Sequence, residues 1–528
     1  MKIFLIVFLI SVLSAGQCRA EIPSSAVRFR PPESLCTAAQ WEVCGAPLVA
    51  VEGENRVAYV PLRRRGTLWD EGAVRKVSLG GMSPERVLWQ TASLLPRNVL
   101  RPAFQNKTFA GGAAEPLEKF DPSLAEVCGL NRNRWNEASA LLRNKKMGAP
   151  FPASMVLAEG FLYVLCDDGI LCALSTVTGR CLWNYLLPQA CCRMKAVLEG
   201  HRSRLPWLCA GGLTAEKDND GELLLWGTLG EGGRGLYCLR PRPTDAELLW
   251  AKETFDQGTF AEIAAFAGPD ELGLTEAAPL AARLWEKDVL VLPSGSGVPG
   301  RLLFFDALLG KLETTVNGFA GHELVLTPLG FADKSGTLSR ILCCDSLGGI
   351  QEFVRQGGSW QADSRADLRS LCGLNDLEPR FSPMVCRTRK GLTAVFVAEG
   401  TKGTVVAASS VHLKNARWGK IPRKSATYGW WQLCEGFSSP FAALCYDGLL
   451  YLAGWQEGRR TLLVIDVTSG EAVLSSRLSE SVRSLTVFSG SVAAVMADGS
   501  VLTVKSLAGS EPLEAARRRY GVVYTLRH

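Results

Sequence analysis

Histidine is scarce in this sequence. The chain has 4 histidines among 528 residues, at His201, His322, His412 and His528, and no two of them have the spacing of a ligand pair. Zinc and non-haem iron sites in proteins depend largely on histidine. The sequence therefore argues against a histidine-built metal site, and it gives little reason to expect a Ser-His-Asp catalytic group.

The chain also lacks a strong excess of charge of either sign. Lys and Arg total 58 and Asp and Glu total 52, so the net charge is +6 over the whole sequence. Proteins that bind nucleic acid or an anionic membrane surface carry a denser basic charge. We therefore expect no nucleic acid among the partners of this protein.

Long apolar runs are absent except at the start of the chain. A lysine precedes the run IFLIVFLISVL, and small and polar residues follow it. This order is typical of a secretory signal peptide, here residues 1–20, with Gly16 as an alternative cleavage point. Gln17 stands before Cys18, where a lipoprotein signal requires a small residue. No later run is long enough to span a bilayer, so we expect an exported protein with no transmembrane segment after removal of the signal peptide.

Cysteine, in contrast, is frequent. The chain has 17 cysteines, and an even number remains once Cys18 is removed. Such a content fits an oxidising compartment, although the spacing does not determine the pairing. Cys36 and Cys44 form the most plausible local pair. For Cys191-Cys192 and Cys343-Cys344 we favour side chains on opposite faces of a strand over a vicinal disulfide.

The clearest structural pattern lies at residues 160–188, which read GFLYVLCDDGILCALSTVTGRCLWNYLLP. Apolar runs flank an Asp-Asp-Gly turn at 167–169. A second turn ends at Gly179, and Trp183 follows. β-branched residues between turns that contain glycine predict a strand, a tight turn, a second strand, another turn and a third strand.

The same cassette returns further along the chain, at 304–311 (FFDALLGK), 464–471 (VIDVTSGE) and 503–510 (TVKSLAGS). Recurrent supersecondary units at long spacing indicate a repeat architecture, and four-stranded units indicate a propeller. We predict an all-β fold, a quinoprotein-like β-propeller of about seven four-stranded blades, with short helices in inserted loops. The units lie near Leu174, Cys238, Phe305, Phe353, Val397, Ile465 and Val504.

The predicted domain organisation is simple. After the signal peptide, residues 21–50 read as an irregular lead-in that contains cysteine. Residues 51–528 form the propeller. Within it, 51–150 is a segment that closes the ring with the C-terminal blade and includes a loop and one short amphipathic helix at 135–146.

The cassette GILCALSTVTGRCLW resembles the quinoprotein-type repeat, in which Ala, Asp, Thr-Gly and Trp hold the blade turns together. Several segments in order resemble, more narrowly, the C-terminal propeller domain of PilY-type proteins, the type IV pilus biogenesis and tip-adhesin factors. The order and approximate spacing hold over nearly the whole mature chain. The segments are 59–89, 135–152, 163–188, 227–241 and 289–312, followed by 326–353.

This resemblance implies a non-enzymatic, exported β-propeller without a cofactor. It would act in type IV pilus assembly or at the pilus tip through protein–protein contacts. Minor pilins or pilus-tip proteins are the implied partners, with a host-surface ligand as a further possibility. The implied location is the periplasm or the cell surface. PilY-type proteins usually have a von Willebrand factor A-like region before the propeller, for which this sequence has no room, so adhesion housed there is not expected.

Two other functions use the same repeat. One is a periplasmic PQQ-dependent quinoprotein dehydrogenase, which would need a calcium-bound quinone, a Glu-Asn-Asp set and a base aspartate that this sequence does not let us assign. The other is a PQQ-repeat scaffold for outer-membrane protein assembly. Gln17 before Cys18 disfavours a lipoprotein of that kind.

PilY-type proteins often carry a calcium loop of the Asp-x-Asp-x-Asp-Gly kind, and the matching place here is 331–336. Calcium prefers about six to eight oxygen ligands, several of them carboxylates. One aspartate, two hydroxyls and a lysine do not supply that charge, so we predict a turn that binds no calcium. The residues at the ligand positions of this degenerate loop are Asp333, Ser335, Gly336 and Ser339.

Four further groups receive structural interpretations. Residues 218–222 (DNDGE) have their glycine in the wrong place for a calcium loop and read as a solvated turn. The basic triplets at 63–65 and 517–519 read as solvated loops rather than partner sites. Trp430-Trp431 reads as a pair that alternates between core and surface rather than as a binding platform. Residues 294–297 lack the strand–turn–helix context of a nucleophile elbow.

Overall fold

The computed structural model describes residues 41–503 with internal gaps, and these residues are almost entirely strands. Within them, the helices are α7 (Leu368–Cys372) and the 3-10 turn η2 (Leu413–Asn415). In this described part, no helix is long and apolar enough to cross a membrane. The gaps are 53–54, 65–70, 80–85, 92–151, 168, 188–208, 219, 231–233, 255–276, 285–286, 295–299, 320–321, 389–390, 417, 421–428 and 489–490.

Several predictions therefore lie outside the described residues. These are the signal peptide, the helix at 135–146, the C-terminal basic triplet, and the cysteines Cys36 and Cys191-Cys192.

The strands of the described residues form eight sheets, which are numbered in chain order. Sheet 1 has β1 (Trp41–Val43), β2 (Leu48–Glu52), β3 (Asn55–Arg64), β4 (Glu71–Ser78) and β5 (Arg86–Gln90). Sheet 2 has β6 (Pro152–Ala158), β7 (Phe161–Cys166), β8 (Ile170–Ser175) and β9 (Cys181–Leu186). Sheet 3 has β10 (Cys209–Lys217), β11 (Leu223–Gly230), β12 (Arg234–Pro241) and β13 (Ala246–Thr254). Sheet 4 has β14 (Leu280–Leu284), β15 (Lys287–Ser294), β16 (Arg301–Asp306) and β17 (Leu312–Asn317).

Sheet 5 has β18 (Leu324–Ala332), β19 (Leu338–Asp345), β20 (Gly349–Gln356) and β21 (Ser359–Asp367). Sheet 6 has β22 (Glu378–Pro379), β23 (Met384–Thr388), β24 (Gly391–Gly400), β25 (Gly403–Ser410), β26 (Trp418–Lys420) and β27 (Gly429–Glu435). Sheet 7 has β28 (Phe437–Tyr446), β29 (Leu449–Gln456), β30 (Arg459–Asp466) and β31 (Ala472–Arg477). Sheet 8 has β32 (Val482–Phe488), β33 (Ser491–Met496) and β34 (Val501–Thr503).

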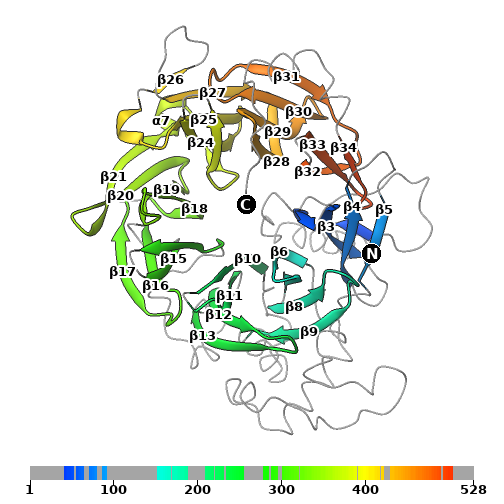
Figure 1. Cartoon of the computed structure of the whole chain (residues 1–528). Coiled ribbons are helices and arrows are strands. Elements are labelled where there is room, and N and C mark those ends of the chain that lie inside the picture. The colour runs from blue at the N-terminus through cyan, green and yellow to red at the C-terminus, as the bar shows by residue number, and fades with distance from the viewer. Residues whose placement is uncertain are drawn as a thin grey trace, which may run out of the picture.

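The sheets stand in a ring around a centre, so that each sheet is one blade of a propeller (Figure 1). The predicted all-β propeller is confirmed. The units predicted near Leu174, Cys238, Phe305, Phe353, Val397 and Ile465 lie in sheets 2–7, and the seventh, near Val504, lies outside the described residues. The segment at 56–90 contributes to a further sheet of its own, sheet 1, which lies between sheets 8 and 2 (Figure 1).

Apolar clusters join each of sheets 2–8 to the next sheet around the ring. Tyr163 of sheet 2, for example, packs with Leu225 of sheet 3, and Leu342 of sheet 5 packs with Phe396 of sheet 6. The ring closes through the cluster that unites Val60 of sheet 1 with residues of sheet 8. Because both faces of a blade are covered, the strands are apolar at successive positions, as in FLYVLC of β7.

The predicted turn cassette recurs in three sheets. It joins β8 to β9, β16 to β17 and β30 to β31. In each case the glycine N–H donates to the carbonyl of the residue four positions earlier. The glycines have φ of +69°, +62° and +75°, a region that favours glycine. They are Gly179, Gly310 and Gly470.

Tryptophans of the outer strands tie these turns to the preceding blade. Trp89 of β5 donates its Nε1–H to the Thr176 carbonyl of sheet 2 at 2.9 Å. Trp183 of β9 makes the same kind of contact with the loop that follows β12, at 2.8 Å. Trp250 of β13 donates to the Ala307 carbonyl of sheet 4 at 3.2 Å. In these three cases a tryptophan on the last strand of one sheet therefore holds a turn or loop of the next sheet.

The adjacent residue pairs behave partly as expected. Cys343 packs in the cluster between sheets 4 and 5, and Cys344 packs in the cluster between sheets 5 and 6. Both are free thiols, so the opposite-face interpretation is confirmed. Trp430 and Trp431 also face opposite sides, but both sides are core, and both residues are buried. The expectation that one would reach the surface is wrong, because sheet 6 is covered on both faces.

The first basic triplet is not a solvated loop where it is described. Arg63 and Arg64 are the last residues of β3. Arg63 is buried, with its Nη2 3.5 Å from Glu42 Oε2, and the Arg64 guanidinium lies over the Trp41 ring at 4.8 Å. The interpretation of these two arginines as solvated is therefore wrong, because β1 pairs with this end of β3 and covers it.

Candidate functional site

The degenerate calcium-type loop is the tight turn between β18 and β19. Asp333 Oδ1 accepts hydrogen bonds from the N–H of Ser335 at 2.8 Å and of Thr337 at 3.2 Å. It also accepts from the Ser335 hydroxyl at 2.5 Å. Gly336 has φ of +80° and donates its N–H to the Asp333 carbonyl. These hydrogen bonds, the one from the Ser335 hydroxyl first, lower the pKa of Asp333.

The same turn occurs where no calcium loop was predicted. Asp218 Oδ1 accepts from the N–H of Asp220 and of Glu222, both at 2.9 Å, and Gly221 takes the position of positive φ. The interpretation of 218–222 as a turn is confirmed, and its described end, 220–222, is exposed. In both turns the aspartate carboxylate accepts hydrogen bonds from the backbone N–H groups of the residues two and four positions after it.

The donor set at 333–339 does not fit calcium. Its single carboxylate already accepts three hydrogen bonds on one oxygen, and Ser339 Oγ donates to the Phe331 carbonyl of the neighbouring strand at 3.2 Å. In the part of the chain that the structure describes, no group of three His, Cys, Asp or Glu side chains is arranged to hold a metal. The absence of calcium binding stays a prediction, tested below.

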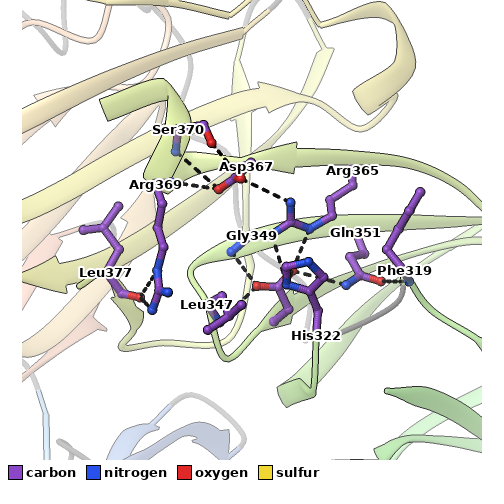
Figure 2. Close-up of polar contacts among 11 residues, drawn as sticks. Phe319, His322, Leu347, Gly349, Gln351, Arg365, Asp367, Arg369, Ser370 and Leu377 are labelled. Atoms are coloured by element: carbon purple, nitrogen blue, oxygen red, sulfur yellow. Dashed lines mark hydrogen bonds and ion pairs between the residues drawn. The ribbon is translucent and has the colours of Figure 1, made fainter. Parts of the chain in front are cut away.

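A more extensive polar site lies at the turn between β19 and β20 (Figure 2). Asp345, the last residue of β19, has 0% of its surface exposed. Its Oδ1 accepts from the N–H of Leu347 at 3.1 Å and from the N–H of Gly349 at 2.7 Å. The turn has the same hydrogen-bond pattern as those at Asp333 and Asp218, but its aspartate is buried.

The other oxygen of Asp345 binds side chains. Oδ2 accepts from Arg365 Nε at 3.0 Å and from Gln351 Nε2 at 3.2 Å. His322 Nδ1 lies 3.7 Å from the same oxygen and 3.3 Å from Arg365 Nη2. The Gln351 Oε1 in turn accepts from the Phe319 N–H at 3.0 Å. The network therefore fixes the connection from sheet 4 into sheet 5 (Figure 2).

The network continues to helix α7. Arg365 Nη1 lies 3.4 Å from Asp367 Oδ2. Asp367 is the N-cap of α7, where its Oδ1 accepts from the N–H of Arg369 at 3.1 Å and of Ser370 at 3.4 Å. The Arg369 guanidinium donates to the Leu377 carbonyl at 3.0 Å. One carboxylate, Asp345, is thus connected to the segment that leads into sheet 6 (Figure 2).

Glu352 is a second fully buried carboxylate, on the opposite face of β20 from Gln351. Its Oε2 accepts from the Ser364 hydroxyl at 2.6 Å and from the Leu413 N–H of η2 at 2.7 Å. Arg340 forms an ion pair with Oε1. Sheet 5 therefore carries two buried carboxyl groups, one on each face, and each lies beside an arginine of its own sheet.

A buried lysine joins sheets 1 and 2. Lys76 Nζ lies 2.5 Å from Glu52 Oε2 and donates to the Thr176 carbonyl at 2.7 Å. Tyr59 donates its hydroxyl to the same Glu52 carboxylate. Burial and the Glu52 carboxylate raise the pKa of Tyr59 above its ordinary range. The Thr176 carbonyl also accepts from Trp89, so both contacts stabilise the same turn.

The geometry of these sites suits the positioning of loops. A general base needs a pKa near the working pH and must reach a substrate proton. The oxygens of Asp345 and Glu352 are instead occupied by hydrogen bonds from backbone N–H groups and by arginine side chains of the same sheet. Ser294, considered above as part of a nucleophile motif, is buried in β15.

Sequence reasoning missed Asp345, Gln351, Glu352 and Arg365. Residues 344–353 (CDSLGGIQEF) lie in the segment 326–353, which was used only for its family resemblance. A usable signal was present, because Gln351 and Glu352 lie between the apolar residues Ile350 and Phe353 of one strand, and buried polar residues need partners. The partners themselves come from 319–322, 365 and 413, positions that the sequence does not place nearby.

Comparison with known proteins gives one limited similarity in sequence. No family model matches the chain. It is 27% identical over 234 residues to a protein of Xylella fastidiosa (strain Temecula1) described as a type IV pilus biogenesis factor PilY1 homolog. The similarity covers 40% of this chain and 17% of that protein. The chain therefore spans only a small part of the relative's length.

Among solved structures, the chain is similar in shape to other proteins at low identity. A europium-containing methanol dehydrogenase has a TM-score of 0.45 at 11% identity, covering 95% of this chain and 91% of that one. Sqt1 of Saccharomyces cerevisiae has a TM-score of 0.48 at 7% identity, covering 88% and 96%. BamB of Moraxella catarrhalis has a TM-score of 0.32 at 10% identity, covering 84% and 80%. Likeness at this level carries no information about function.

Proposed function

We propose that this chain is a non-enzymatic, exported β-propeller that acts in type IV pilus assembly or at the pilus tip through protein–protein contacts. Its partners would be minor pilins or pilus-tip proteins, in the periplasm or at the cell surface.

The observation that carries the proposal is the sequence similarity to the PilY1 homolog, at 27% identity over 234 residues. The segments that resemble PilY-type propellers, among them 163–188, 289–312 and 326–353, support it because they occur in order along this chain. The relative is much longer, so its complete activity is not attributed to this protein.

The structure supports a binding role on physical grounds. A closed ring of sheets packed on both faces is a rigid disc, and its loops can contact partners without a loss of order in the core. The buried networks around Asp345 and Lys76 hold such loops in place. A preorganised surface loses little conformational entropy on binding.

The contacts of the buried carboxylates also favour a non-enzymatic role over a quinoprotein dehydrogenase. That enzyme would need carboxylates available to calcium and to the quinone. Asp345 and Glu352 are each paired with an arginine and with backbone N–H groups. Asp333 is occupied by its own turn.

The test is a blot for the native protein in surface fibres sheared from cells, beside the periplasmic fraction. We expect the protein in the sheared fraction, and we expect it to be lost from that fraction when the major pilin is deleted. A soluble periplasmic protein serves as the control for leakage.

Detection only in the periplasm, with pilus number unchanged after deletion of this gene, would contradict the proposal. The purified protein should then be examined for the absorbance of a bound quinone and for calcium-dependent, dye-linked alcohol oxidation. Either signal would favour the dehydrogenase.

A further inference from the structure

Two cysteines from neighbouring sheets meet in the core. Cys386 lies on β23, an edge strand of sheet 6, and Cys445 lies on β28, the first strand of sheet 7. The two strands pack directly against each other. Both side chains belong to the same buried cluster between these strands, so the two thiols share one interior site.

The surroundings of this pair are apolar. Cys386 is 2% exposed and Cys445 is 7% exposed. Both belong to the cluster between sheets 6 and 7, which includes Val395, Phe437 and Leu450. Two thiols and a disulfide are both able to pack against apolar side chains. Formation of a disulfide here would therefore not require any polar group to move.

We propose that Cys386 and Cys445 form a disulfide that joins sheets 6 and 7 when the exported chain folds. This inference rests on the export that is part of the proposed function, but it does not depend on the role in pili. In the structure both residues are free thiols.

The reaction is a thiol–disulfide exchange. Each thiol gives up one proton and the pair gives up two electrons, and one S–S bond forms between Cys386 and Cys445. The electrons reduce the active-site disulfide of a thiol–disulfide oxidoreductase, or a small-molecule disulfide such as oxidised glutathione, to two thiols. The exchange passes through a mixed disulfide with one of the two cysteines.

The burial of the two cysteines determines at which stage of folding the disulfide can form. The hydrogen bond from Cys386 and the burial of the site raise the pKa of Cys445 well above that of an exposed thiol. The thiolate is the reactive form, so the folded, reduced protein should react very slowly. Oxidation therefore takes place before sheets 6 and 7 have packed together.

Two other buried cysteines, Cys172 and Cys434, do not point to one disulfide partner. Cys172 contacts both Cys166 and Cys181 within sheet 2, so the contacts do not select one partner. Cys434 shares the cluster of Cys386 and Cys445, but it lies on β27 and its thiol pKa is raised by burial alone. Cys434 therefore provides a matched control.

The experiment uses the full chain exported from a bacterial host, denatured with an alkylating reagent and no reductant, and digested for mass spectrometry. We expect one cross-linked peptide that contains Cys386 and Cys445, lighter by two hydrogens than the sum of the two thiol peptides. Alkylation of both residues in the exported protein would overturn the proposal, and so would a cross-link from either residue to a different cysteine.

Two variants and one control reaction make the result specific. Cys386→Ser should leave Cys445 fully alkylated, whereas Cys434→Ser should leave the cross-link unchanged. Unfolded wild-type protein refolded with reduced and oxidised glutathione should form the same cross-link, and folded, reduced protein in the same buffer should not. Because these readouts require no pili, a negative result in sheared fibres would leave the disulfide test valid.

Discussion

The indole of Trp89 lies directly on Gly179, the glycine that closes the β8–β9 turn of the next sheet. A Cβ atom at position 179 would overlap the indole ring. The same indole donates its N–H to the Thr176 carbonyl of that turn at 2.9 Å. A residue without a side chain is therefore required here for two reasons, the positive φ and the contact with the ring.

Gly179→Ala should destabilise the protein more than Gly160→Ala. Both glycines have positive φ, +69° and +79°, but a Cβ at Gly160 would have nothing within 4 Å. The backbone strain is about 1–2 kcal/mol at either position, and overpacking against Trp89 adds about 1–3 kcal/mol at position 179. Chemical denaturation measures the difference. Equal losses for the two variants would show that the contact with the ring does not matter.

Lys76→Met should lower the free energy of unfolding by about 2–3 kcal/mol, because it removes charged hydrogen bonds at a buried position. Lys217→Met is the matched control. Its ion pair with Glu159, at 2.6 Å, joins two exposed side chains and should contribute little. Thermal unfolding at low and high salt checks both. A large loss for Lys217→Met alone would contradict the importance of burial.

Asp345→Asn should cost about 3–5 kcal/mol, because the Arg365 guanidinium loses a fully buried partner. Asp333→Asn preserves the corresponding turn at an exposed position and should change stability little. The measurement is the midpoint of urea unfolding for the two variants. If Asp345→Asn behaves like Asp333→Asn, the network in Figure 2 does not stabilise the fold.

Stability should fall at high pH, in part through Tyr163. Burial, and secondarily the Glu159 carboxylate, raise the pKa of Tyr163 from 10.0 to about 12. Because the folded pKa is raised, the contribution is complete below pH 10.0 and is lost as the pH rises toward 12. The slope from this one group cannot exceed roughly 1.4 kcal/mol per pH unit, the value for a difference of one bound proton between the folded and unfolded states. Tyr163→Phe should make the fall between these values shallower, and an unchanged fall would exclude Tyr163 as a cause.

Calcium should have no effect at the 333–339 loop. Millimolar calcium or a chelator should leave the melting temperature unchanged for the wild-type protein and for Asp333→Asn. A rise in melting temperature with calcium that is absent from the variant would show that the loop binds the ion despite its single carboxylate.

The sequence predicted the fold better than the polar sites. Local patterns define the strands and turns, so the cassettes at Gly179, Gly310 and Gly470 could be recognised one by one. The propeller followed from their repetition. Sheet 1 was harder to foresee, because β1 and part of β2 come from the segment read as an irregular lead-in, and their pairing with β3 depends on tertiary contacts.

The polar sites depend on residues that are distant in sequence. The Asp345 site takes a histidine from 322 and an arginine from 365, and Glu352 accepts from the N–H of residue 413. Periodicity reports which face a residue occupies and says nothing about the partner on the next sheet. For the same reason Arg63 was read as solvated, although Glu42 and β1 lie beside it.

The closure of the ring between sheets 1 and 8 has a consequence for the time course of folding. The two sheets are separated by roughly 390 residues of sequence. At a synthesis rate of about 5–20 residues per second, the partner of sheet 1 is complete only roughly 20–80 s after sheet 1 itself. During that interval the face that contains Val60 and Leu62 has no sheet to cover it. The first sheet to be made is thus the last to be protected, and it is the surface on which a chaperone would have the longest time to act.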